Sequence, residues 1–217
     1  MSLLEALSPE KERQILDGAA RAFAADGYEG ASMSRIAAVA GVSKGTLYNY
    51  FAGKRELFAA FVHRECSGQI TLIFDDIDAN AALEAVLPLI CRRMLDMLTS
   101  DTGLLIYRMV VAEAAKVPEL AEAFFEAGPR RALAAMARWI EGQCKAGRLE
   151  VTDPSFAAEQ LFGLMQTRVL MRRRLRLAQS VDDAELDRVV AAGVWVFLRA
   201  YAAPGRAGSD TLGDSGR

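Results

Sequence analysis

The sequence predicts an all-α protein, and three observations carry that prediction. Apolar residues recur at intervals of three and four, the periodicity of a helix with one buried face. Val, Ile and Thr never alternate with polar residues over a useful length, so strands are not expected. Helix starts marked by Ser, Asp or Pro, and helix ends marked by Gly, divide the 217 residues into about nine to ten helices.

Composition allows a sizeable core, and charge restricts the class of partner. Hydrophobic residues make up 52% of the chain, and the formal net charge is −2. This charge excludes a globally basic protein but not a focused basic patch. No run approaches the roughly 18 uncharged apolar residues of a membrane span. The start, MSLLEALSPEKER, lacks the basic and apolar segments of a signal peptide. We therefore expect a cytoplasmic protein with no membrane partner.

Catalytic and metal-binding patterns are missing from the sequence. Cys66, Cys91 and Cys144 are far apart and odd in number, which favours reduced thiols, with a redox sensor as the alternative. His63 lies three residues before Cys66 but has no third partner for catalysis or metal binding. No Gly-rich phosphate loop, paired catalytic carboxylates or Ser-based motif occurs. We expect no catalytic residue, no metal, no cofactor and no enzymatic activity.

Residues 32–58 carry the most specific pattern, SMSRIAAVAGVSKGTLYNYFAGKRELF. It predicts a short helix, a tight turn, a second short helix and the start of a third. Gly41 suits the left-handed conformation of a helix end, and Ser43 can cap the second helix. Leu47 and Phe51 then face inward at i, i+4 spacing. This is the sequence form of a helix-turn-helix, whose second helix enters the DNA major groove.

The exposed side of the second short helix is polar and basic. Residues 30–55 contain four basic side chains and no acidic one, although the whole chain is slightly acidic. Anionic phosphate is the natural partner of such a surface. The alternative is a short solvated helical hairpin with no role in nucleic-acid binding.

The segment GVSKGTLYNYFAGKRELF, residues 41–58, resembles the signature of the tetracycline-repressor (TetR) family of bacterial transcription regulators. The resemblance is strong from Lys11 to about His63. It is weaker towards the C-terminus, where only helix lengths and scattered residues match. It implies a three-helix DNA-binding domain, a larger helical domain for ligand binding and dimerisation, and repression relieved by a small molecule.

The resemblance also suggests which residues contact operator DNA. Lys44 and Thr46 are best placed for bases, and Gly45 lets the helix lie close to the groove. Most of the other polar side chains grip phosphates, which fixes position rather than sequence. The expected DNA-binding residues are Ser32, Ser43, Lys44, Gly45, Thr46, Tyr48, Asn49, Tyr50 and Lys54.

Prolines and glycines place the remaining helix boundaries. Pro9, Pro118, Pro129 and Pro154 stand where the first turn of a helix is expected. Gly27 is the expected left-handed residue after the first helix. The expected helices cover about residues 9–25, 34–40, 44–50, 54–75, 81–98, 102–115, 118–127, 129–145, 154–177 and 182–202.

Two domains and a tail follow from this series of helices. We expect a helix-turn-helix DNA-binding domain over 9–62 and a ligand-binding and dimerisation domain over 63–203. The boundary falls inside a long helix, which is a stiff connection rather than a flexible linker. Residues 204–217 are rich in Gly, Ser and charge and are expected to be disordered.

The last two helices are apolar on more than one face, which is typical of helices buried on two sides. The second side suits another copy of the chain; the alternative is a helix at the centre of one subunit. The expected dimer-interface residues are Phe162, Met165, Val169, Val189, Gly193, Val196 and Phe197.

Methionine and aromatic side chains are spread over the middle helices. Met adapts to irregular gaps, and Tyr and Trp add a polar group to an apolar body. They suit a mainly apolar ligand pocket, although the same residues at helical spacing also suit plain core. The expected ligand-binding residues are Met94, Met97, Tyr107, Phe125, Met136, Trp139 and Met165.

The basic cluster MRRRLRL, residues 171–177, ends the penultimate helix, where cations complement the helix dipole. This structural role is preferred; binding a ligand carboxylate or steering DNA are the alternatives.

Together these patterns and the resemblance to the TetR family imply a homodimeric repressor that binds a near-palindromic operator and is released by a small, mainly apolar effector. Two alternatives stay open. One is a constitutive DNA-binding regulator without a ligand pocket, and the other is an all-α enzyme.

Overall fold

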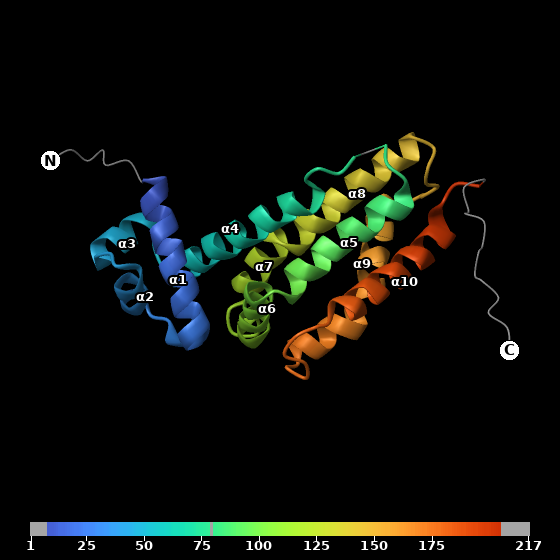
Figure 1. The fold of residues 1–217 in the computed structure, drawn as a ribbon. Coiled ribbons are helices and arrows are strands. Elements are labelled where there is room, and N and C mark those ends of the chain that lie inside the picture. Colours follow the sequence, from blue (N-terminus) through green and yellow to red (C-terminus); the bar gives the residue numbers. More distant parts are fainter. Residues whose placement is uncertain (1–7, 79, 205–217) are drawn as a thin grey trace. The chain divides into compact units, whose positions relative to one another are not determined.

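The protein is all-α, as predicted. The computed structural model describes residues 8–78 and 80–204, and these form ten helices (Figure 1). Apart from Pro204, the expected disordered tail lies outside the described residues. No helix in the described ranges is long and apolar enough to span a membrane. The helices are α1 (Pro9–Gly30), α2 (Met33–Ala40), α3 (Lys44–Tyr50), α4 (Lys54–Phe74), α5 (Leu83–Thr99), α6 (Asp101–Glu113), α7 (Pro118–Ala127), α8 (Pro129–Lys145), α9 (Pro154–Arg174) and α10 (Asp183–Tyr201).

The predicted helix-turn-helix punctuation is confirmed. Ser32 caps α2, and Ser43 caps α3, each accepting a backbone N–H of the first turn through its hydroxyl. Gly41 ends α2 with φ 68°, a left-handed conformation that a side chain would strain. Gly27 has φ 69° and interrupts the helical conformation of α1, so the chain turns at the predicted glycine.

The chain divides into two compact units that differ from a simple N-terminal and C-terminal split. The first unit extends to Ile73 and resumes over Met97–Arg131, so it contains α1–α4, α6 and α7. The second unit consists of Phe74–Asp96 and the chain from Ala132 onward, and it contains most of α5 and α8 with α9 and α10. Because α5 and α8 each pass from one unit to the other, the units are connected by continuous helices.

The core of the first unit is aromatic. Phe23 of α1 packs edge-on against Phe58 of α4, with ring centroids 5.5 Å apart, and Tyr28 packs edge-on against Phe58 at 5.3 Å. Buried residues of α6 and α7, among them Val110 and Leu120, belong to the same cluster. The helix-turn-helix therefore shares one core with α6 and α7, which the sequence placed in the other domain.

The second unit is held by close packing of α9 on α10 and by an ionic cluster. A Cβ on Gly193 of α10 would come within 3.0 Å of the Met165 side chain of α9, so these helices approach at a glycine. Arg92 of α5 donates to Asp183 and Asp187 of α10. This cluster fixes α5 to the start of α10.

The predicted end of the penultimate helix is wrong. Helix α9 ends at Arg174 rather than 177, because Arg176 takes a left-handed conformation with φ 58°. Arg173 of the basic cluster donates to the carbonyl oxygens of Ala178 and Gln179, which holds the following loop against the end of α9. The role of the cluster in complementing the helix dipole stays a prediction.

Candidate nucleic-acid interface

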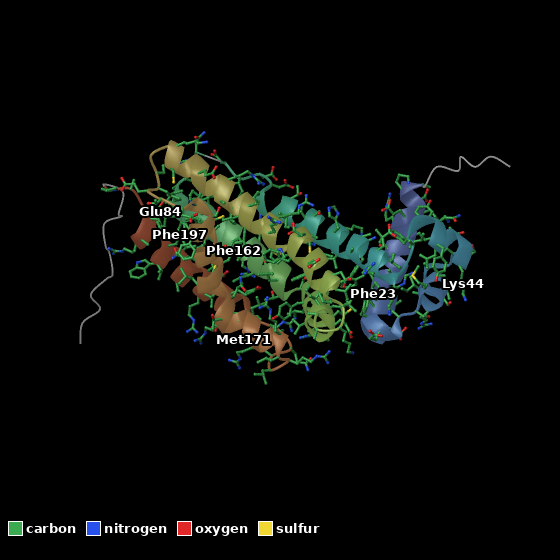
Figure 2. All side chains as sticks on the ribbon, turned by 180° about the vertical axis from the view of Figure 1, so that it is seen from behind. Phe23, Lys44, Glu84, Phe162, Met171 and Phe197 are labelled. Carbon is green, nitrogen blue, oxygen red and sulfur yellow. The ribbon has the colours of Figure 1, made fainter. Side chains whose placement is uncertain are left out.

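Helix α3 is anchored on one side and free on the other. Leu47 is completely buried and Phe51, its C-cap, is nearly so. Lys44, Tyr48 and Asn49 are exposed on the remaining surface. In Figure 2, Lys44 projects from α3 away from the core that contains Phe23. A seven-residue helix has little stability of its own, so this packing is what keeps the polar face in a fixed orientation.

A short hydroxyl network orients the start of α3. The Ser43 Oγ accepts the backbone N–H of Thr46 at 3.0 Å and lies 2.8 Å from the Thr46 Oγ1. The hydroxyl of Thr46, expected to contact a base, is thus held in one direction before DNA arrives. A Cβ added at Gly45 would contact only the Ser43 hydroxyl, at 3.8 Å. The surface of α3 at this residue is therefore open to an approaching DNA groove.

Tyr50, at the end of α3, connects the helix to the start of α1. Its hydroxyl accepts the backbone N–H of Ser8 at 2.6 Å. Ser8 also caps α1 through its backbone carbonyl, which accepts the N–H of Glu12. The start of α1 is thereby held beside α3, the recognition helix.

Lys54 is a structural residue as well as an expected phosphate contact. Its ammonium donates to the carbonyl oxygens of Tyr28 at 2.7 Å and Glu29 at 3.2 Å. It also lies 4.5 Å from the centre of the Tyr28 ring. An ammonium has three donors, so one remains for DNA.

Charge on this surface is more focused than the sequence count suggests. Arg35 pairs with Asp26, and Arg55 pairs with Glu119, so two of the four basic side chains are partly neutralised. Within the described ranges the ammonium group of Lys44 has no ion-pair or hydrogen-bond partner. The effective positive charge of α3 and its flanks therefore resides mainly on Lys44 and Lys54.

The expected ligand-binding residues are divided between the two compact units. Met97, Tyr107 and Phe125 belong to the first and the other four to the second, so their convergence stays a prediction. The side chains differ in burial. Met94, Met136 and Met165 are almost completely buried, Met97, Tyr107 and Trp139 are half-buried, and Phe125 is 52% exposed.

Most of the expected dimer-interface residues are buried by helices of their own chain. Val196 is 42% exposed and can meet a second copy without rearrangement. The others fill the core of the second unit: Phe162, Met165, Val169, Val189, Gly193 and Phe197.

Sequence reasoning missed the apolar surface beside these residues. Phe156, Leu164 and Met171 of α9 are exposed at intervals of eight and seven, which places them along one face of that helix. Trp195, next to Val196 on α10, is 59% exposed. Periodicity could have separated this outward stripe from the inward one, because exposed and buried apolar residues alternate along both helices.

These features define a helix-turn-helix DNA-binding protein: a capped, anchored recognition helix with an unpaired cation, placed on an all-α scaffold. Two sequence-family matches agree with this class. "Bacterial regulatory proteins, tetR family" matches residues 15–61, and "AefR-like transcriptional repressor, C-terminal domain" matches residues 85–203. The chain belongs to the TetR family of transcription regulators.

Similar proteins support the assignment over nearly the whole chain. A TetR-family regulator from Mesorhizobium loti MAFF303099 has 31% identity and a TM-score of 0.80, with 89% of this chain and 98% of that one covered. The flavonoid-responsive regulator FrrA has 29% identity and a TM-score of 0.78, with 92% and 100% covered.

Curated relatives match over a shorter length. The fatty acid metabolism regulator protein of Bacillus subtilis (strain 168) is 31% identical over 96 residues, which is 44% of this chain and 50% of the relative. The chain thus spans about half the length of that relative, and 41% of the repressor AcnR of Corynebacterium glutamicum.

Proposed function

We propose that this protein is a homodimeric repressor that binds a near-palindromic operator and is released by a small, mainly apolar ligand. The observation that carries the proposal is the geometry of α3. Its polar face, with Lys44 unpaired and Thr46 held by Ser43, is fixed by the burial of Leu47 and Phe51. Such a face reads bases, while Lys54 and the start of α1 fix position on the phosphates.

Dimerisation supports the proposal because one recognition helix buries too little surface for tight, specific binding. The exposed apolar stripe on α9 and α10, centred on Leu164 and Trp195, suits a self-complementary interface between two copies. Gly163 lies beside Leu164 with open space around its Cα, which allows close helix approach. Two recognition helices would then be spaced about one DNA turn apart, roughly 34–36 Å.

Release by a ligand requires two conformations with different affinities for that ligand. The flavonoid response named for FrrA supports a small, mainly apolar effector for this chain too. The start of α8 contacts α4, the helix that follows the helix-turn-helix. Arg131, in its first turn, donates to His63 Nε2 and to Ser67 Oγ of α4, both at 2.9 Å. Helix α4 in turn begins at Lys54, beside the recognition helix.

Sequencing of genomic fragments retained by the purified protein tests the function. The proposal expects one enriched motif with two inverted half-sites about one DNA turn apart. Enrichment of a single half-site would contradict binding as a dimer. The absence of any enriched sequence would contradict sequence-specific binding to an operator.

A further inference from the structure

Helix α8 carries two buried polar atoms without a hydrogen-bond partner. They are the indole Nε1 of Trp139 and the amide Oε1 of Gln143. Gln143 is 3% exposed as a whole, so its amide is shielded from bulk solvent. Unsatisfied buried polar groups are rare in native proteins, and each requires an explanation.

The two residues lie on the same face of the helix. Residues four apart are neighbours on a helix surface, with Cβ atoms about 5–6 Å apart. One atom is a donor and the other an acceptor, and neither carries charge. Met136 and Ile140, which continue this buried side of α8, are fully buried apolar residues. The arrangement is therefore a neutral donor–acceptor pair beside apolar side chains.

The backbone at Gln143 is held firmly. Its carbonyl oxygen accepts the N–H groups of Arg148 at 2.9 Å and Leu149 at 3.4 Å, which closes the end of α8. Leu149 then forms a bridge with Ala202, after α10. A fixed backbone limits how far the amide of Gln143 can move to find a partner in its own chain.

We propose that Trp139 and Gln143 bind a hydroxyl group of the effector, an inference that rests on the proposed ligand response. The hydroxyl oxygen accepts the indole N–H, and its hydrogen is donated to the Gln143 Oε1. One group thus satisfies both atoms. A carboxylate or ketone only accepts, so it would leave the Gln143 oxygen unpaired. The effector class is a mainly apolar molecule with an alcohol or phenol group.

Calorimetric titration with four matched probes tests this assignment: 2-naphthol, 2-methoxynaphthalene, naphthalene and 2-naphthoate. Wild type should bind 2-naphthol about ten-fold more tightly than naphthalene or the methyl ether, the usual effect of a satisfied buried hydrogen bond. Gln143→Met and Trp139→Phe should each reduce this preference to less than about two-fold while naphthalene still binds. Glu141→Gln, at an exposed position on the same helix, is the matched control and should keep the preference.

Thermal unfolding without ligand gives an independent reading. Gln143→Met removes an unpaired buried oxygen, so its Tm should rise by about 2–4 °C. A fall in Tm would mean that the pair already holds a buried water, and it would overturn the inference.

Other outcomes also overturn it. Equal affinity of wild type for 2-naphthol and naphthalene would show that the pair reads no hydroxyl, although a ligand site exists. Tighter binding of 2-naphthoate would mean that the amide presents its N–H₂ group instead. Binding of none of the four probes would exclude a site of this class on α8. Operator affinity measured without any probe is unaffected by these results, so the proposed DNA-binding function is tested separately.

Discussion

The ammonium of Lys54 donates to the backbone carbonyl oxygen of Tyr28 at 2.7 Å while lying over the same residue's ring. The first residue of α4 is thereby tied to the turn that precedes α2. The Lys54 ammonium thus connects the segment before the helix-turn-helix, at Tyr28, to the start of α4 after it. This contact couples the position of α4 to that of the recognition helix.

Removing this cation should reduce both stability and salt sensitivity. Lys54→Met leaves the Tyr28 and Glu29 carbonyl oxygens without their charged donor, a loss of about 1–3 kcal/mol. It also removes one phosphate contact, so the slope of log affinity against log salt should fall by about one. Thermal unfolding and operator titration at several salt concentrations measure the two effects. Lys44→Met, which breaks no contact among the described residues, should leave Tm unchanged. Equal Tm values for Lys54→Met and wild type would contradict the structural role.

The apolar stripe predicts which substitutions separate the dimer. Leu164→Glu or Trp195→Glu leaves the folded subunit intact but buries an unpaired charge in the assembled interface, at a cost of several kcal/mol. Light scattering should show monomers. Val111→Glu, at an equally exposed apolar position on α6, should remain a dimer. A dimeric Leu164→Glu variant would move the interface elsewhere.

Gly193→Glu is a poor probe of the same interface, although Gly193 was among the expected interface residues. Its new Cβ would crowd Met165 at 3.0 Å. The Gly193→Glu variant should therefore have a lower Tm and be monomeric, whereas Val196→Glu should be monomeric with an unchanged Tm. Parallel unfolding and light-scattering measurements distinguish the two results.

Arg131 should transmit the effector signal without binding either ligand. Arg131→Met removes the hydrogen bonds to His63 and Ser67 that join α8 to α4. Operator affinity without effector and effector affinity without operator should both change little. The ratio of operator affinities with and without effector should shrink from the usual 5–150-fold of such couplings towards one. An undiminished ratio in Arg131→Met would show that the signal travels through other contacts.

Two thiols are protected by burial. Burial raises the pKa of Cys91 to about 12 and is the main reason that the pKa of Cys66 rises to about 11. Iodoacetamide at pH 8 should leave both unmodified in the native protein, because only about one Cys66 thiol in a thousand is ionised there. Mass spectrometry after alkylation measures this, and rapid modification of either residue would contradict it.

The same shifts give a direction for alkaline stability. An unfolded thiol ionises near pH 8.5, so the native state holds its proton to higher pH. The associated stability is complete below about pH 8.5 and is lost as pH rises towards the native values. Cys91→Ala should therefore show a shallower fall of Tm between about pH 8.5 and 11 than wild type. Parallel curves of Tm against pH for the two proteins would mean that Cys91 does not contribute to the pH dependence of stability.

Helix boundaries were predictable because they depend on local chemistry. Caps at Ser32 and Ser43, the left-handed Gly41 and the start of α8 at Pro129 each involve residues within a few positions of one another. The end of α9 was missed because Arg173 closes it through a loop folded back on the helix. No periodicity in the sequence specifies such a return.

The candidate sites were predictable in part for the same reason. The exposed face of α3 follows from helical spacing around Leu47. The ties of Lys54 to Tyr28 and of Tyr50 to Ser8 join residues 26 and 42 positions apart, which only tertiary packing brings together. Trp139 was predictable as a ligand-binding residue because its indole combines an apolar ring with an N–H donor. Gln143 was not predictable, because only the structure shows that its amide oxygen is buried without a hydrogen-bond partner.

The most direct test of the central claim is a titration of the selected operator with wild type and Thr46→Val. Wild type should bind as two protomers per duplex, at least about 10³-fold more tightly than to a scrambled duplex of the same length and salt concentration. Thr46→Val, which lacks the oriented hydroxyl, should lose most of that preference while keeping its affinity for scrambled DNA. Equal affinity of wild type for operator and scrambled duplex would contradict sequence reading by α3.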